Sequence, residues 1–441
     1  MGCSSSSSFS WRRLLFVWGL FRFINPTLLW TVHASATVAS EATVKEENTA
    51  NDVVTSVPSS SYSSSSSSSY STYRFLHKTV IIPHDAKKFR GGEDAAATTD
   101  QLLVVADGVG GWANRGVNPG LYSRLLTNTI VELFEQENRD SNNKNKKKND
   151  NDTPLQKDDF LVNIVDKANH HAAEQHLGSA TCTVVQLVGP NQLKTLNIGD
   201  SGYSIHRRKP PPQKNGGDEE DEDDSASPLP PLEVVFASIP GQKQFNFPHQ
   251  IGGKYGDIVS DVADQKTHAL QPGDVLIVYS DGVSDNLYPQ DYHDCIDRYS
   301  HPVRNESPPS NKQQNGMFEI VSYSLVADCI ARQAYVLGKD KSFDSPFAQG
   351  ARNVGKRYIG GKHDDITVTV AQVVVEQQQE EEETAGPSSA PTTVLAEDPH
   401  YTESIYIYTG PIPSKEDLPT LEQVLAKTVE VGGSFGNNDE L

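Results

Sequence analysis

The central part of the sequence predicts an α+β sandwich. Many short runs rich in valine, isoleucine and leucine are separated by turn-rich joints, which is typical of β-strands. Two pairs of segments with apolar residues at helical spacing lie among these runs. Many strands combined with two pairs of helices indicate this fold class. No internal repeat is visible in the sequence.

The chain has 441 residues, but low-complexity segments divide it. Such segments bury too little apolar surface to offset the entropy cost of ordering them. One domain with a sizeable core is therefore expected at 73–375. The other expected segments are a targeting or anchor segment at 1–40, a serine-rich linker at 41–72, inserts near 139–157, 209–231 and 299–316, and an acidic low-complexity tail at 376–441.

The first half of the domain is expected to contain two strands and two helices. The strands are 79–83 and 101–106, both short and apolar. Pro119 suits the first turn of a helix, and apolar residues at helical spacing continue it to about residue 135. A second helix is expected at 158–177, with Gly178 as its end.

The second half begins with a hairpin signal, in which Gly189-Pro190-Asn191-Gln192 separates two β-rich runs. Further apolar runs and helical patterns follow in the same manner. The expected strands are 181–188, 193–198, 203–205, 232–236, 274–279 and 366–375, and the expected helices are 289–298 and 318–337.

The formal net charge of -20 is concentrated in a few segments. Residues 218–224 are seven consecutive acids, and Glu376 with 380–383 adds five more. These segments are most simply solvated, so the charge says little about a partner. The two basic patches, 144–148 and 207–209, lie beside low-complexity inserts, which argues against nucleic acid as the ligand.

The four cysteines are Cys3, Cys182, Cys295 and Cys329, and they form no Cys-x-x-Cys pair. A zinc site and a disulfide framework are therefore not expected, and a reducing compartment fits better than a secreted one. None of them starts the Cys-x5-Arg loop of a cysteine-based phosphatase. Cys182 lies in an apolar strand pattern and is expected in the core.

The N-terminal segment is expected to direct localisation. Residues 1–40 contain no acid but include three arginines, many serines and bulky apolar residues, which suits a mitochondrial or plastid presequence. Two alternatives stay open. In the first, residues 11–32 would form a signal peptide or anchor, with Ala34-Ser35-Ala36 as the cleavage site. In the second, Met1-Gly2-Cys3 would begin an acylation motif.

Three apolar strands have an aspartate at one end, namely Asp107, Asp281 and Asp364, and Glu93-Asp94 lies upstream of the first. Carboxylates gathered at one sheet edge shift one another's pKa values unless cations lie between them. This arrangement predicts a site for two ions of Mg²⁺ or Mn²⁺, which prefer oxygen ligands. Two such ions can activate a water and orient a phosphoryl group, so the expected chemistry is hydrolysis.

Six motifs occur in the order and approximate spacing of the metal-dependent 2C-type protein phosphatases. The chain resembles this family over about 73–375, and most closely its mitochondrial branch, whose members have Asp-Gly-Val-Gly-Gly-Trp. The resemblance implies a four-layer sandwich of two antiparallel β-sheets flanked by α-helices, with a dinuclear site at one end. The motifs are Gly92-Glu93-Asp94, 105–111, Gly178-Ser179-Ala180-Thr181, 197–201, 280–285 and 363–367.

The resemblance also implies roles for individual residues. Asp107 would bridge both ions, the Gly108 carbonyl would help to hold one, and Asp281 and Asp364 would bind the other. These three aspartates would carry the catalysis. The complete set of implied metal ligands is Glu93, Asp94, Asp107, Gly108, Asp281, Asp285 and Asp364.

Four further residues have less direct implied roles. Glu93 would act through metal-bound water, and Asp94 and Asp285 would be outer or third-ion ligands. Asp200, in the Gly-Asp-Ser motif, would support loop structure rather than bind metal.

The chain departs from the family at Val109, where the larger family usually has a histidine that serves as a candidate general acid. The proton for the leaving group would then come from metal-bound water or another group such as His363. The phosphate-binding arginine is assigned to Arg90, with Arg74 and Arg115 as alternatives.

The implied function is hydrolysis of phosphoserine and phosphothreonine on proteins, without a covalent intermediate, by a Mg²⁺- or Mn²⁺-dependent monomer. Any membrane contact would involve the N-terminal segment. A catalytically silent fold used for binding and a hydrolase of small phosphoesters are the alternatives, because fold alone does not fix the substrate. Residues after Ser414 are expected to form either a short docking helix or a fraying tail.

Overall fold

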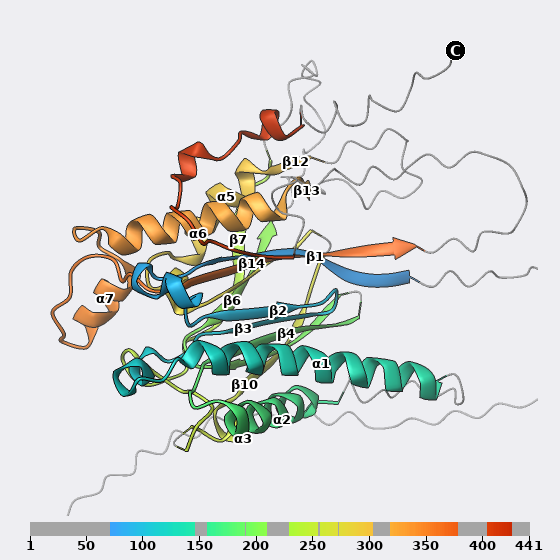
Figure 1. Ribbon diagram of the computed structural model, residues 1–441. Coiled ribbons are helices and arrows are strands. Elements are labelled where there is room, and N and C mark those ends of the chain that lie inside the picture. Colours follow the sequence, from blue (N-terminus) through green and yellow to red (C-terminus); the bar gives the residue numbers. More distant parts are fainter. Residues whose placement is uncertain are drawn as a thin grey trace, which may run out of the picture. The chain divides into compact units, whose positions relative to one another are not determined.

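The computed structural model describes residues 71–145, 157–189, 191–209, 229–254, 256–271, 273–302, 318–377 and 404–425. These residues all belong to one compact unit. They form two large β-sheets that pack face to face, with helices on the outer side of each (Figure 1). The predicted α+β class and its four-layer sandwich are confirmed.

The first sheet has six strands in the order β15-β1-β14-β11-β6-β7. Its neighbours pair in antiparallel fashion, except that β15 runs parallel to β1. The register of β1 with β14 is continuous from Ser71 opposite Gln377 to Ile82 opposite Ile366. The strands are β1 (Ser71–Ile82), β6 (Gly202–Arg208), β7 (Leu232–Ala237), β11 (Val275–Tyr279), β14 (Ile366–Gln377) and β15 (Ile405–Ile407).

The second sheet has five strands in the order β10-β5-β4-β3-β2, and all of its neighbours are antiparallel. The predicted hairpin is present as β4 and β5. The sequence patterns did not predict the two edge strands β2 and β10. The strands are β2 (Ala95–Thr98), β3 (Leu102–Ala106), β4 (Cys182–Gly189), β5 (Gln192–Ile198) and β10 (Asp264–Ala269).

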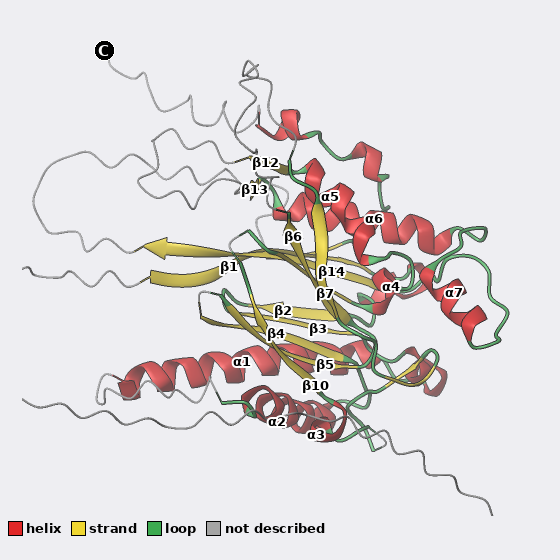
Figure 2. Cartoon of the chain, turned by 180° about the vertical axis from the view of Figure 1, so that it is seen from behind, coloured by secondary structure: helices red, strands yellow, loops and turns green. Residues whose placement is uncertain are grey.

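Two pairs of helices cover the outer faces, as Figure 2 shows from behind. The helices α1 (Pro119–Asn145) and α2 (Phe160–Gln175) cover the second sheet, and α5 (His293–Arg298) and α6 (Tyr323–Lys339) cover the first. The short elements are η1 (Asp85–Arg90), η2 (Gly110–Arg115), α3 (Val259–Val262), α4 (Asp281–Ser284), η4 (Pro289–Tyr292), α7 (Pro346–Asn353), η5 (Lys415–Asp417), and the strand pairs β8 (Gln242–Gln244) with β9 (Phe247–Pro248) and β12 (Ser300–Pro302) with β13 (Phe318–Ile320).

Alternating side chains connect the four layers. In β3, Leu102 and Val104 point into the core beneath α1 and α2, whereas Leu103 and Val105 point into the core between the sheets. Successive residues of a strand face opposite sides, so a wholly apolar strand must be covered on both faces. This explains why β3 reads as an unbroken apolar run.

Three predicted boundaries were wrong. Strand β1 begins at Ser71, not at residue 79. Helix α1 was expected to end at about residue 135, but it continues to Asn145. The helix expected at 318–337 starts only at Tyr323, because Phe318 and Ile320 are buried while Glu319 is exposed, which is the period of a strand.

Part of the predicted tail belongs to the fold. Strand β15 adds to the edge of the first sheet beside β1, and Tyr408 and Leu418 are buried against the core under α6. The edge of β1 offers backbone groups that need partners, and this segment supplies them. The name C-terminal strap is used below for residues 404–425.

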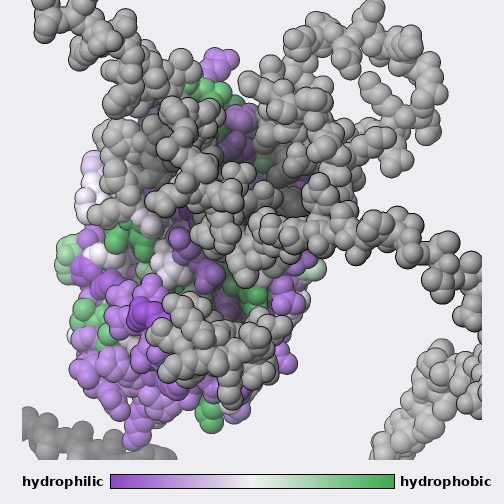
Figure 3. Space-filling view, turned by 90° about the vertical axis from the view of Figure 1, so that its right-hand side faces the viewer, coloured by the Kyte–Doolittle hydropathy of each residue, from purple (hydrophilic) through white to green (hydrophobic). Residues whose placement is uncertain are grey.

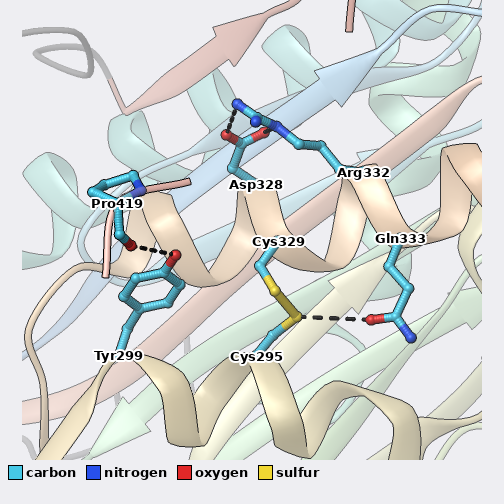
Figure 4. Close-up of a disulfide and its surroundings, with 7 residues drawn as sticks. All are labelled: Cys295, Tyr299, Asp328, Cys329, Arg332, Gln333 and Pro419. Atoms are coloured by element: carbon cyan, nitrogen blue, oxygen red, sulfur yellow. Dashed lines mark hydrogen bonds and ion pairs between the residues drawn. A yellow bond between two sulfur atoms is a disulfide. The ribbon is translucent and has the colours of Figure 1, made fainter. Parts of the chain in front are cut away.

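No disulfide framework was expected from the cysteine spacing, yet the structure contains one disulfide. Cys295 of α5 and Cys329 of α6 form a disulfide with a Cα–Cα distance of 5.8 Å (Figure 4). Their separation of 34 residues matches no spacing motif, and only the packing of the two helices brings them together. Cys182 is buried and free, as the strand pattern predicted.

Figure 3 shows the face of the molecule at which β1 begins and β14 ends. Its lower part, where α1 and α2 lie, is mainly hydrophilic, and its apolar residues form small separate groups. Among the described residues, no helix is long and apolar enough to cross a bilayer. The predicted targeting segment and serine-rich linker lie outside the described residues.

Candidate metal centre

The carboxylates predicted from strand ends converge at one end of the sandwich. Asp107 follows β3, Asp200 follows β5, and Asp281 begins α4 directly after β11. Each of the three offers a carboxylate oxygen that lies within 4.8 Å of the others. Residues from both sheets therefore share one small site.

Hydrogen bonds join the two sheets at this end. The Thr367 hydroxyl, at the start of β14, donates to Asp94 at 2.8 Å. The backbone N–H of Glu93 donates to Asp365 at 3.1 Å, and that of His84 donates to the same carboxylate at 2.7 Å. The segment that precedes β2 is thus fixed to the segment that precedes β14.

Lys87 lies among these carboxylates on one side. Its Nζ is 2.6 Å from Glu93 Oε2, 3.1 Å from Asp364 Oδ1 and 2.9 Å from Asp365 Oδ2. Burial alone would lower the pKa of this lysine, but the charges of Asp364 and Asp365 outweigh burial and raise it. The ammonium group therefore stays charged.

Lys362 lies on the other side. Its Nζ is 2.5 Å from both Asp281 Oδ2 and Asp285 Oδ2, and 3.7 Å from Asp364 Oδ2. Burial would again lower the pKa of the lysine, but the adjacent carboxylates raise it well above its ordinary value. Burial also raises the pKa of Asp364, yet Lys362 and Lys87 together keep it below its usual range.

The negative charge of the site exceeds what its own cations balance. Eight carboxylates face four cations, Lys87, Arg90, Arg124 and Lys362, which leaves a formal surplus of four negative charges. The term carboxylate cluster is used below for these eight residues. They are Glu93, Asp94, Asp107, Asp200, Asp281, Asp285, Asp364 and Asp365.

Burial and mutual repulsion make ionisation of several of these groups costly. Burial, with the charge of Asp365 added, raises the pKa of Asp94 to about 8. Burial and the charge of Asp281 raise the pKa of Asp200 to about 6, and the pKa of Asp107 is raised for the same reasons. Positive charge supplied at this site would favour the ionised forms of these carboxylates.

The hydrogen-bond pattern shows where that charge fits. Asp94, Asp200 and Asp281 each direct one carboxylate oxygen to a protein donor, namely Thr367, Gln242 and Lys362. The second oxygen of each carboxylate is buried and has no hydrogen-bond donor among the described residues. Buried, unpaired, anionic oxygens are suitable ligands for a hard divalent cation, so the residues present fit Mg²⁺ or Mn²⁺.

Gly108 is held where a larger residue would not fit. A Cβ at this position would lie 2.6 Å from the Glu93 carbonyl oxygen and 3.2 Å from the Pro119 carbonyl carbon. Its N–H donates to that Glu93 oxygen at 3.2 Å. The role of its own carbonyl as a ligand stays a prediction.

The structure brings the predicted carboxylates together and adds Asp200 to them. Glu93, Asp94, Asp107, Asp281, Asp285 and Asp364 all lie in the carboxylate cluster, and whether each one binds metal stays a prediction. The expectation that Asp200 serves loop structure rather than metal is not supported by its position, since it lies with Asp107 and Asp281. Only the alignment of β5 with β4 and β3 brings its loop to this end.

The three candidate arginines lie in different places. Arg90 is at the centre, where its Nη2 is 2.5 Å from Glu93 Oε1. Arg74 pairs with Val374 along β1, far from the end of that strand that reaches the centre. Arg115 lies over the Trp112 ring in η2, with its guanidinium 5.5 Å from the ring centroid.

His363 lies beside the centre in an aromatic contact. Its ring is 4.2 Å from that of His84 and 5.6 Å from that of Tyr335, and its Nε2 is 3.8 Å from Asp85. Burial and the neighbouring His84 lower its pKa. Its role as a general acid stays a prediction.

Sequence patterns missed four residues of the centre, namely Lys87, Asn286, Lys362 and Asp365. Two of them flank the predicted His363-Asp364 pair in the run Gly360-Gly361-Lys362-His363-Asp364-Asp365. A buried position for a lysine is not predictable from such a loop, because lysines in loops are usually solvated. The excess of acids in the predicted site is the signal that could have pointed to the two lysines, because clustered carboxylates need positive charges nearby.

Comparisons with known proteins show which family the chain belongs to. No family model matches the chain. It is 31% identical over 303 residues to "Probable protein phosphatase 2C 55" of Arabidopsis thaliana, covering 68% of this chain and 52% of that protein. It is also 31% identical over 283 residues to "Protein phosphatase PTC7 homolog" of Danio rerio, covering 62% of this chain and 76% of that protein. The chain thus spans about half the length of the Arabidopsis relative.

A solved structure is also similar, that of the photosystem II phosphatase PBCP. The identity is 28%, the TM-score is 0.48, and the match covers 68% of this chain and 98% of that one.

The fold and the site define a two-sheet sandwich with an acidic centre at one end. The match to the zebrafish protein, at 31% identity over 76% of that protein, shows the family as well. The chain belongs to the protein phosphatase 2C family.

Proposed function

We propose that this protein hydrolyses phosphoserine and phosphothreonine on proteins, with two ions of Mg²⁺ or Mn²⁺. The observation that supports this most directly is the grouping of Asp107, Asp200 and Asp281, in which one carboxylate oxygen each of Asp200 and Asp281 is buried and unpaired. When bound there, the ions would supply the Lewis acid that activates water and orients the phosphoryl group.

The residues of the chain would perform the remaining tasks. Asp107, between β3 and η2, lies where carboxylates of both sheets meet and is the residue best placed to bridge two ions. Arg90 lies at the centre, where it contacts Glu93. A guanidinium there suits the bidentate binding of a phosphate group, so Arg90 would position the substrate.

The proposed chemistry uses a metal-activated water as the nucleophile, so it forms no covalent intermediate with the protein. The described cysteines are either in the disulfide or buried in the core, so none is a candidate nucleophile at the centre. Activated water is the nucleophile that fits this arrangement.

The test is hydrolysis of a phosphothreonine peptide and an aryl phosphate with EDTA, Mg²⁺ or Mn²⁺. We expect activity with either ion and loss in EDTA. Asp107→Asn should reduce kcat/KM by about two orders of magnitude or more, since even indirect support of a metal is worth about 10–100-fold. The matched control is Asp166→Asn on the exposed face of α2, which should leave activity unchanged.

Each outcome separates the proposal from its alternatives. Activity on the aryl phosphate alone would indicate a hydrolase of small phosphoesters. No activity with any ion, in protein that melts cooperatively, would indicate a silent binding fold. Full activity of Asp107→Asn would show that the carboxylate cluster is not the catalytic centre.

We also propose that the protein belongs to the mitochondrial branch of the family and is imported into mitochondria. The support is the Asp107-Gly108-Val109-Gly110-Gly111-Trp112 run and the acid-free composition of residues 1–40. A fluorescent fusion of the full chain should colocalise with a mitochondrial dye, and deletion of 1–40 should abolish this. A full-length fusion that is cytosolic, secreted or at the plasma membrane would contradict import.

A further inference from the structure

Lys362 occupies a position in the carboxylate cluster that a metal ion would otherwise suit. Its ammonium group lies between Asp281 Oδ2 and Asp285 Oδ2, 2.5 Å from each. Asp285 is one of the two residues expected to serve an outer or third ion. In the structure the carboxylate of Asp285 is instead paired with a cation that belongs to the chain.

The backbone around Lys362 is fixed on two sides. The Asn286 side chain is fully buried, accepts from the Lys362 N–H at 2.9 Å and donates to the Lys362 carbonyl at 2.8 Å. The same amide donates to the Gly282 carbonyl at 2.9 Å, which ties the loop to α4. On the other side, the Tyr358 hydroxyl donates to the Gly361 carbonyl at 2.9 Å.

An aromatic ring also restrains the ammonium group. The Lys362 Nζ is 5.2 Å from the centroid of the Phe347 ring in α7, within the range of a cation–π contact. The Phe347 ring is itself held between Phe245, at 4.9 Å, and Tyr358, at 4.8 Å. The lysine is therefore a built part of the centre rather than a surface side chain that reaches in.

The charge balance agrees with this role. The carboxylate cluster has a formal surplus of four negative charges with Lys362 counted among its cations. Two divalent ions would neutralise that surplus, and a third would reverse its sign next to a fixed ammonium group. In a buried site, the ammonium group of Lys362 would strongly repel a divalent cation placed next to it.

We propose that Lys362 is an internal cation at the outer position of the centre, so that the protein takes two divalent ions and not a third. The inference rests on the proposed function, because it assumes that the centre binds divalent metal. Lys362 acts here as a positioning residue that holds Asp281 and Asp285, and the unpaired oxygen of Asp281 would remain available to a metal ion.

The test is the number of Mn²⁺ ions bound per chain, measured by titration calorimetry and by metal analysis after equilibrium dialysis of the full chain. We expect two for the wild type and three for Lys362→Met, which keeps the length of the side chain but removes its charge. Lys362→Arg keeps the charge and should stay at two. The matched control is Lys339→Met, because Lys339 pairs with Asp85 outside the carboxylate cluster.

A second variant makes the test independent of how well Lys362→Met folds. If Lys362 rather than a metal ion neutralises Asp285, then Asp285→Asn should still bind two ions. If Asp285 is a metal ligand, the same variant should lose one ion or bind it at least tenfold more weakly.

The outcomes are distinct. Three ions in the wild type, two in folded Lys362→Met, or loss of an ion in Asp285→Asn would each overturn the role of Lys362. A wild type that binds no divalent ion would overturn the proposed function, and with it the premise of this inference.

Discussion

Gly108 illustrates, at the scale of a single residue, how backbone crowding shapes the centre. The position is closed by the carbonyl oxygen of Glu93 and by the backbone of Pro119. Both obstacles are main-chain atoms of fixed segments, so they cannot move aside as the end of a flexible side chain would. The glycine keeps the loop that carries Asp107 against the segment that carries Glu93.

We therefore predict that Gly108→Ala lowers the free energy of unfolding by about 1–3 kcal/mol, through overpacking, and weakens Mn²⁺ binding. Urea denaturation and calorimetry would measure the two effects. The control is Gly111→Ala in the same loop, where the nearest atom to an added Cβ is 4.0 Å away. Equal stability of the two variants would contradict the steric explanation.

His206 is the residue whose ionisation should most clearly affect stability. Its ring is buried and forms two hydrogen bonds. Nε2 is 2.7 Å from Ser204 Oγ, and Nδ1 is 3.1 Å from His293 Nε2. Burial, with the neighbouring His293, lowers the pKa of His206 to about 3. His206 therefore takes up a proton near pH 6.5 in the unfolded chain, but only near pH 3 in the folded protein.

We predict that stability is full above about pH 6.5 and falls as the pH decreases toward 3, by up to about 1.4 kcal/mol per pH unit from this group. Urea denaturation between about pH 4.5 and 7.5 would measure the slope. His206→Gln should flatten it, whereas His170→Gln, at an exposed position in α2, should not. An unchanged slope in His206→Gln would mean that other groups dominate acid unfolding.

At the scale of elements, the buried ion pair of Asp328 and Arg332 in α6 binds the C-terminal strap. The Tyr408 hydroxyl donates to Asp328 at 2.7 Å and accepts from Arg332 Nη2 at 2.6 Å. Arg332 also donates to the Ser414 carbonyl at 2.9 Å, and Figure 4 shows Asp328 and Arg332 side by side on α6. The strap therefore completes a network that would otherwise leave a buried ion pair only partly satisfied.

We predict that Tyr408→Phe lowers the free energy of unfolding by about 1–3 kcal/mol, because it leaves buried groups without a partner. Limited proteolysis should also cut the strap faster in this variant. Tyr288→Phe is the matched control, since the hydroxyl of Tyr288 donates to Gln349 in an exposed position. Equal protease resistance of Tyr408→Phe and the wild type would show that the network does not hold the strap.

The disulfide between α5 and α6 is a second link between elements on the same side of the sandwich. It closes a loop across a separation of 34 residues. A crosslink of this span restricts the unfolded chain.

We predict that the Cys295→Ala/Cys329→Ala variant is less stable than the oxidised wild type by about 2–4 kcal/mol. Denaturation with and without dithiothreitol would measure this. The reductant should destabilise the wild type but not the double variant, which retains Cys182. A wild type that is indifferent to reductant, although mass analysis shows its thiols free, would contradict the prediction.

At the scale of the whole described structure, the carboxylate cluster joins the two sheets. Asp107 and Asp200 come from the second sheet, whereas Asp281 and Asp364 come from the first. A cation bound between them contacts both halves of the sandwich. Metal binding should therefore stabilise the domain as one unit.

We predict that Mn²⁺ at about 100 times its Kd raises the free energy of unfolding by about 2.7 kcal/mol for each site, with a single cooperative transition. EDTA should reverse the gain, and Asp107→Asn should lose most of it. Asp166→Asn should respond like the wild type. A second transition that appears only with Mn²⁺ would contradict coupling of the two sheets.

Much of this architecture could be predicted from the sequence. The strands β3 and β11 are unbroken apolar runs that end in Asp107 and Asp281, so both the strands and the site residues at their ends were predictable. Strand β10 was not predictable, because its residues Asp264–Ala269 are mostly polar and it lies at an edge. Edge strands lack the continuous apolar signal of central ones.

The sequence by itself determined the fold class and most of the carboxylate cluster, because apolar periodicity and strand-end aspartates are local signals. The tertiary structure alone decided that Asp200 joins the site, that Lys87 and Lys362 lie inside it, that Cys295 meets Cys329, and that the strap covers β1. Each of these depends on contacts between segments far apart in the chain. No local pattern encodes such contacts, because only sheet register and helix packing determine which distant side chains meet.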